Sequence, residues 1–185
     1  VSSMKSIFSG IQRKVSSPLL STQETGKALD ALNTIPTEDK EVIMVAVAPI
    51  LQEGAAEAVV NIATILKGVT NKQGKAEFLE AVLEITEEDR AQIIADAKPI
   101  LQNITDGYQI TNILKILSEI PAEDRDKFIA DVESILKNIT DGYQIKTILE
   151  ILSEIPAEDR DKLITYAEYI LKNIIDDSLI ITILK

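Results

Sequence analysis

The stretch that decides the fold is Asn-Ile-Thr-Asp-Gly-Tyr-Gln-Ile at residues 103–110, which recurs letter for letter at residues 138–145. The repetition extends to whole units: 27 of 35 aligned positions are identical between residues 103–137 and 138–172. Self-similarity at such a period is typical of repeat arrays, in which one supersecondary unit stacks on the next. A unit of this length cannot bury its own apolar faces, so neighbouring units must share a core.

A second motif marks the start of a helix in each unit. Ile-Pro-Ala-Glu-Asp-Arg occupies residues 120–125 and 155–160, and related forms begin at Ile35 and Ile85. Proline suits the first helical turn, where its missing N–H would be unpaired, and acidic residues suit the positive end of the helix dipole. Apolar residues then follow at i, i+3, i+4 and i+7, which predicts an amphipathic helix over about 122–137.

Capping residues indicate where further helices begin. Thr86, with Asp89 three positions later, is a variant of the capping box. Thr140 or Asp141 is expected to cap a second helix of the unit, just before Gly142. The turn between the two helices of a unit is therefore short, as in a helix-turn-helix pair.

These patterns predict an all-α protein. No segment alternates with a period of two between turn dipeptides, so we predict no sheet. The expected fold is an α-solenoid of about nine helices, stacked as helix-turn-helix repeats with a period of about 35 residues into a right-handed superhelix.

Residues 1–185 are predicted to form a single α-helical repeat domain, expected to be a fragment of a longer protein. Pro49 and Pro99 fall inside predicted helices, which we expect to kink or end early because proline removes a backbone hydrogen bond. Lys5 to Lys14 is a basic helix candidate. The predicted segments are repeat units near 22–54, 70–102, 103–137 and 138–172, an extra helix over 55–67, and a partial unit over 173–185.

The composition favours a soluble, non-catalytic protein. The chain has 30 acidic and 19 basic side chains and a formal net charge of −11, which repels nucleic acids and anionic membranes. It contains no cysteine and no histidine, so thiolate metal sites and the commonest general base are missing. We predict no enzymatic activity, no cofactor and no metal. A cysteine-free chain is compatible with the cytoplasm or with secretion, so the compartment stays open.

The segment over residues 68–76 has the lysine and two glycines of a phosphate-binding loop, but at the wrong spacing. The glycines are six positions apart, Ala76 replaces the Ser or Thr that would reach a magnesium ion, and no strand precedes them. We interpret residues 68–74 as an interhelical loop.

The eight positions that differ between the two close copies point to a surface. Positions 111, 112 and 115 are predicted to form one polar helical face and positions 130, 131 and 134 another, whereas 128 and 132 are interpreted as core. Tuning toward a partner would produce this pattern, and so would neutral drift. The repeated tyrosines suit an interface, or they cover the end of the apolar layer. The predicted partner-binding residues are Tyr108, Gln109, Asn112, Lys115, Tyr143, Gln144, Thr147, Glu150, Tyr166 and Tyr169.

The layout resembles the broad class of helix-pair solenoids, such as tetratricopeptide, pentatricopeptide and HEAT repeats. The resemblance is one of architecture: none of their side-chain signatures matches, including the Trp…Leu-Gly…Tyr pattern of tetratricopeptide units. The acidic charge also argues against an RNA-binding role, which requires basic surfaces.

The predicted function is a non-enzymatic scaffold that binds a protein or peptide along an extended helical surface. The alternative is a structural spacer or self-assembling repeat segment of a larger protein, such as a host-directed or surface protein of a microbe. Self-association through the uncapped C-terminal repeat is a further expectation. Exposed tyrosines beside a groove favour the scaffold, whereas buried rings and a uniformly charged surface favour the spacer.

Overall fold

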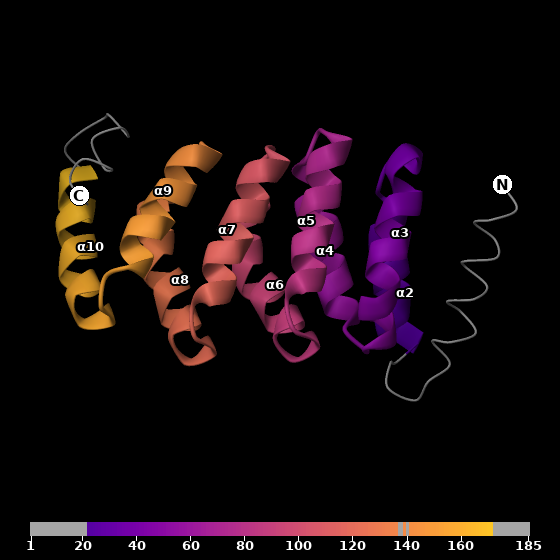
Figure 1. Ribbon diagram of the computed structural model, residues 1–185, viewed down its shortest axis with the longest axis horizontal. Helices are drawn as coiled ribbons and strands as arrows, with labels where there is room; N and C mark the ends of the chain where they lie inside the picture. Colours follow the sequence, from indigo (N-terminus) through magenta and orange to yellow (C-terminus); the bar gives the residue numbers. More distant parts are fainter. Residues whose placement is uncertain (1–21, 137–138, 140, 172–185) are drawn as a thin grey trace, which may run out of the picture.

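The computed structural model describes residues 22–136, 139 and 141–171. Within these residues the chain forms nine α-helices and no strand (Figure 1), as predicted. The basic candidate helix from Lys5 to Lys14 and the partial unit 173–185 lie outside the described residues. The helices are α2 (Thr22–Asn33), α3 (Thr37–Gln52), α4 (Ala56–Gly68), α5 (Lys72–Glu84), α6 (Glu87–Leu101), α7 (Gly107–Glu119), α8 (Ala122–Leu136), α9 (Gly142–Ser153) and α10 (Ala157–Leu171).

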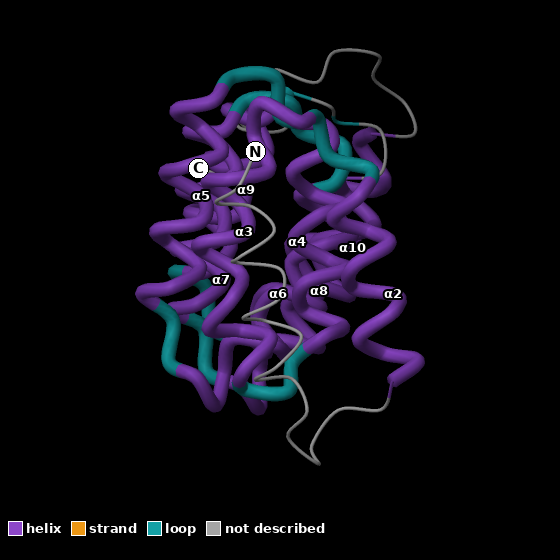
Figure 2. The backbone as a smooth tube through the Cα atoms, turned by 90° about the vertical axis from the view of Figure 1, so that its right-hand side faces the viewer, coloured by secondary structure: helices purple, strands orange, loops and turns teal. Residues whose placement is uncertain are grey.

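The helices lie in two layers. Helices α3, α5, α7 and α9 form one layer, and α2, α4, α6, α8 and α10 form the other (Figure 2). Most helices pack chiefly against the next helix but one, such as α2 against α4 and α5 against α7. This packing is consistent with a helical repeat, in which each element contacts its near neighbours.

The extra helix of the sequence, α4, is a full member of one layer. Successive helices alternate between the two layers. Because α4 adds one helix to this series, the helices before it lie in the opposite layer from their counterparts in the later repeats. Helix α3 begins with the same motif as α6, α8 and α10, yet it packs against α5 in the opposite layer. The motif therefore determines where a helix starts but does not determine the layer in which the helix lies.

Side-chain caps start four of the described helices. Asn71, Thr86, Asp106 and Asp141 each accept a hydrogen bond from the backbone N–H three residues later. This confirms Asp141 as a cap. Asn71 starts α5 at Lys72, so the prediction of a loop as far as residue 74 is wrong.

Proline occupies two different positions in these helices. Pro36 is the N-cap of α3, one place before the first helical residue, and its C=O accepts the N–H of Asp39. Pro49 and Pro99 lie inside α3 and α6, but both helices continue beyond them. The expectation that these helices end early is wrong, because a proline near a helix end withdraws one hydrogen bond while the apolar face stays packed.

One apolar core runs the length of the described chain, from Ala28 in α2 to Ile164 in α10. Gly54 follows the end of α3, and its φ of 86° is the left-handed conformation that glycine adopts most easily. Backbone bonds from Gly54 N–H to the Leu51 C=O and from Ala55 N–H to the Ile50 C=O complete a Schellman turn, which redirects the chain into α4.

Candidate binding surfaces

Two tyrosines extend into solvent from neighbouring helices. Tyr108 and Tyr143 lie in the first turns of α7 and α9, which pack against each other, and the two residues are 62% and 63% exposed. The caps Asp106 and Asp141 hold these turns in place. The rings therefore do not cover the core, and they present aromatic surface at equivalent points of two repeats. We call the exposed side of α7 and α9 the tyrosine face.

A groove of about 370 Å³ runs between α7 and α9 on this face. Four of its residues, Asn112, Lys115, Lys146 and Glu150, occupy positions at which the two close copies differ. Its remaining lining residues are Ile116, Glu119, Ser153 and Glu154. The sequence differences on these helices are therefore concentrated beside the groove.

Lys146 connects the tyrosines with the groove. Its Nζ lies 2.7 Å from Glu150 Oε1. The hydrogen bond to Glu150 raises the pKa of Lys146 above its ordinary value. Desolvation acts in the opposite direction, and the charge of Glu150 and the nearby Tyr143 and Tyr108 phenols add to the rise. Lys146 thus stays protonated at neutral pH beside both rings, and its contribution to folding is lost only when alkaline pH rises through the elevated pKa.

The other residues predicted on this face have mixed environments. Gln109, Gln144 and Thr147 are half-buried, and the Thr147 hydroxyl donates a hydrogen bond to the Tyr143 C=O. Lys115 is exposed and lies 3.9 Å from Glu84 of α5. Gln109 Oε1 and Asn112 Nδ2 are buried without a hydrogen-bond partner among the described residues.

Two sequence interpretations of exposed faces are wrong. Thr111 is buried, and its hydroxyl donates to the Gly107 C=O, as a threonine facing inward on a helix commonly does. Asp131 is half-buried and faces α10, where its Oδ2 lies 3.8 Å from Arg160. The interpretation of positions 128 and 132 as core is correct for the copy in α8, because Phe128 and Val132 are both buried.

Tyr166 and Tyr169 are not brought together with the other tyrosines. Both belong to α10, which lies in the layer opposite to α7 and α9. Their side chains lie outside the described residues. The predicted residues therefore belong to helices of both layers.

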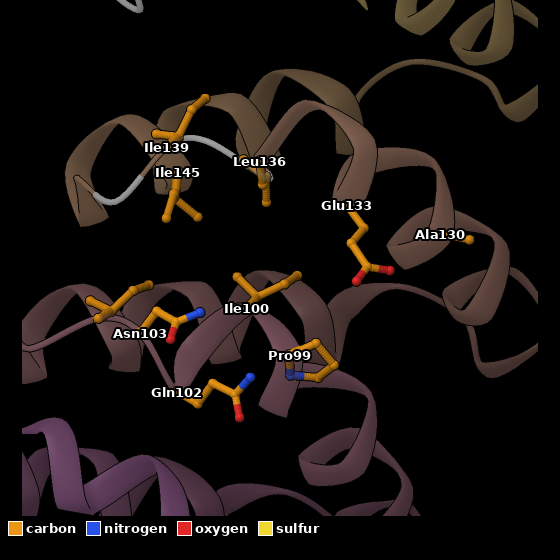
Figure 3. Close-up of a pocket in the computed structure, with 10 residues that line it drawn as sticks. Pro99, Ile100, Gln102, Asn103, Ala130, Glu133, Leu136, Ile139 and Ile145 are labelled. Atoms are coloured by element: carbon orange, nitrogen blue, oxygen red, sulfur yellow. The ribbon is translucent and has the colours of Figure 1, made fainter.

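A second groove, of about 600 Å³, opens between the C-terminal halves of α6 and α8 (Figure 3). Leu136, Ile145 and Glu133 point across it toward Ile100 and Pro99. No sequence motif indicates this groove directly, although Pro99 and Ala130 stand at positions that vary between copies. The other lining residues are Gln102, Asn103, Ile104 and Ile139.

A row of buried arginines joins the helices, and sequence reasoning missed it. Arg125 lies at the start of the second turn of α8. Its Nε donates a hydrogen bond to the Leu117 C=O (3.1 Å), and its Nη2 donates one to the Ile120 C=O (2.9 Å). Its Nη1 lies 3.6 Å from Asp96 of α6. The guanidinium thus caps the carbonyls at the C-terminal end of α7 and links α8 with α6 in the other layer. The recurrence of an arginine at the same place in the helix-start motif is the sequence signal from which this row could have been predicted.

Equivalent arginines occupy the two neighbouring helices. Arg90 contacts the end of α5 and forms an ion pair with Glu53 at 2.5 Å. Arg160 bonds the end of α9 and lies 4.7 Å from the centre of the Phe128 ring, within the range of a cation–π contact. These arginines stabilise the stack and are not free to bind a partner.

No group of three His, Cys, Asp or Glu side chains in the described ranges is arranged to hold a metal ion. In the same ranges, no helix is both long and apolar enough to cross a bilayer. Neither a protein-family model, nor a curated protein, nor a solved structure matches this chain.

Proposed function

We propose that this chain is an α-solenoid of 35-residue units in a right-handed superhelix, and that it is a non-catalytic scaffold which binds a protein or peptide on its tyrosine face. The observation that carries the proposal is the exposure of Tyr108 and Tyr143, 62% and 63%, on helices that pack together. Tyrosine supplies a large contact area at a small cost in side-chain entropy and retains a hydroxyl for hydrogen bonding.

The adjoining groove supports the same proposal. Its walls carry charges of both signs, including Lys115, Glu119 and Glu154, around the partly buried Ile116. A mixed polar rim around an apolar centre is typical of protein interfaces. The copies conserve the tyrosines and differ along the groove, so each pair of helices would contact the same kind of partner with different local preferences.

Affinity capture with the full chain tests this proposal. The double variant Tyr108→Ala/Tyr143→Ala removes both rings from exposed positions, so the fold should be unchanged by circular dichroism. We expect a partner that binds the parent to be lost from the double variant, because tyrosine is enriched among the hot-spot residues whose truncation costs about 2 kcal/mol or more.

Glu123→Ala is the matched control, because Glu123 is equally in a first turn and exposed but lies on α8 in the opposite layer. Equal capture by the parent and the double variant would contradict the proposal and leave the spacer as the better reading. Loss of capture by the control as well would show that the tyrosine face is not the site.

A further inference from the structure

The α6–α8 groove has the size and lining of a ligand site. Its volume of about 600 Å³ falls within the range of about 300–1,000 Å³ seen for binding pockets. Aliphatic side chains from four parts of the chain line it: Ile100 of α6, Ile104, Leu136 of α8, and Ile145 of α9. These side chains are almost fully buried within the protein, so an apolar group entering the groove would complete an existing core.

Local sequence explains why the space opens here. Helix α6 packs more extensively against α4 than against α8. The wall of α8 carries Ala130, where the next unit carries the larger Thr165, and the opposite wall carries the compact ring of Pro99. Figure 3 shows Ala130 at one end of the groove, with Glu133 between it and the aliphatic end.

The electrostatics of the groove favour a cation. Helices α6 and α8 both end beside it, at Leu101 and Leu136, and the C-terminal end of a helix carries the negative end of its dipole. The carboxylate of Glu133 points across the groove. Among the described lining residues there is no positive charge to balance these groups.

Two amide side chains complete the lining. Gln102 and Asn103 are exposed at the point where the chain leaves α6. Each carries both hydrogen-bond donors and an acceptor, which is the combination that pairs with a peptide main chain.

We propose that the α6–α8 groove binds a peptide segment in which an aliphatic side chain is followed by lysine or arginine. The aliphatic side chain enters between Ile100 and Leu136, the cation lies near Glu133 and the helix ends, and Asn103 bonds the peptide main chain. The groove opens mainly between α6 and α8, in the layer opposite to the tyrosine face, and it does not depend on that face binding anything.

Methyl NMR on the full chain, with labelled isoleucine and leucine, tests the proposal. The probe is the capped peptide Gly-Ser-Leu-Lys-Ser-Gly, with Leu-to-Ser and Lys-to-Glu versions as matched controls. We expect the methyl signals of Ile100, Leu136 and Ile145 to shift on titration. We expect each control peptide to bind about tenfold more weakly, since each loses one of the two recognised groups. Shifts at other methyl groups only, or equal shifts with all three peptides, would overturn the proposal.

A substitution that fills the groove gives an independent test. Ala130→Leu adds a side chain to an exposed helical position at its wall, and Ala95→Leu makes the same change at the equivalent position of α6, which does not line the groove. Ala130→Leu should abolish the peptide-induced shifts, whereas Ala95→Leu should keep them. Glu133→Lys should weaken binding of the lysine peptide and strengthen binding of the glutamate peptide. Unchanged titration of Ala130→Leu would rule the groove out.

Sedimentation velocity of the parent and of Ala130→Leu tests whether the groove instead binds a second copy of the chain. The peptide site predicts the same sedimentation coefficient for the parent and for Ala130→Leu. A parent dimer that Ala130→Leu converts to a monomer would show that the groove is covered by another copy, and that result would overturn the proposal.

Discussion

A close approach between two repeats depends on a pair of glycines. Gly107 begins α7 and lies directly against Gly74 in the first turn of α5. A Cβ on Gly107 would lie 2.6 Å from the Gly74 carbonyl carbon, which is backbone and cannot move aside. A Cβ on Gly142, the equivalent glycine of α9, would meet the side chain of Gln109 at 2.9 Å instead. The same residue in two nearly identical repeats therefore has different constraints.

We predict that Gly107→Ala destabilises the protein by about 1–3 kcal/mol, the usual range for overpacking a close contact. Gly142→Ala should cost less, because the Gln109 side chain can change rotamer. Gly26→Ala should stabilise by about 0.5–1 kcal/mol, since nothing lies within 4 Å and alanine is the better helix former. Urea unfolding at equal m-values measures the change in stability of all three variants. An equal effect of Gly107→Ala and Gly142→Ala would contradict the difference in packing between these two glycines.

At the scale of elements, the inserted helix places α3 against α5 and buries an ion pair between them. Asp39 of α3 and Lys75 of α5 are both buried and bonded to each other. Asp39 belongs to the helix-start motif, and its counterparts Asp89, Asp124 and Asp159 are exposed. Lys75 stands where the later repeats have a core isoleucine, Ile110 or Ile145. The lysine thus neutralises a carboxylate that the change of layer has moved into the core.

Lys75→Ile should therefore destabilise the protein by about 3–5 kcal/mol, because it leaves the Asp39 carboxylate buried and unpaired. The double variant Asp39→Leu/Lys75→Ile should recover to within about 1 kcal/mol of the parent or exceed it, since an apolar pair avoids the desolvation cost. Lys115→Ile is the control, and it should cost under about 1 kcal/mol because its ion pair with Glu84 is exposed. Chemical denaturation measures these differences, and a double variant as unstable as Lys75→Ile would refute this account.

At the scale of the whole molecule, every extensive contact joins helices that are adjacent or next but one along the chain. The described chain has no contact of comparable extent between its first and last helices. Stability in such an arrangement is close to a sum of unit and neighbour terms, so damage to one unit should spread only to its neighbours.

Hydrogen exchange measured by mass spectrometry should show this locality. Ile62→Ala in α4 and Leu149→Ala in α9 each remove a fully buried side chain and should cost about 2–5 kcal/mol. We expect the first to reduce protection in α2 to α6 while α9 and α10 change little, and the second to do the reverse. Uniform loss of protection over all helices in both variants would instead indicate one cooperative unit.

Prediction from sequence worked where the determining interactions are local. The cap Asp141 and the helix that follows depend on atoms within one turn, so residue type and spacing were sufficient. The exposure predicted for Thr111 and Asp131 failed, because the outcome depends on which helix lies alongside. The α6–α8 groove was invisible for the same reason, since its two walls are about 30 residues apart in sequence and their separation is a matter of packing.

The sequence by itself determined the all-α class, the starts of helices such as α6 and α9, and the internal repeat, because capping hydrogen bonds between near neighbours and the 3.6-residue period of apolar side chains are local properties. Only the tertiary structure decided the layer of α3, the burial of Asp39 and Arg125, and the positions of the two grooves. Those features depend on how many helices lie between one helix-start motif and the next and on the shapes of the side chains that meet across layers. Both are non-local properties that no single repeat contains.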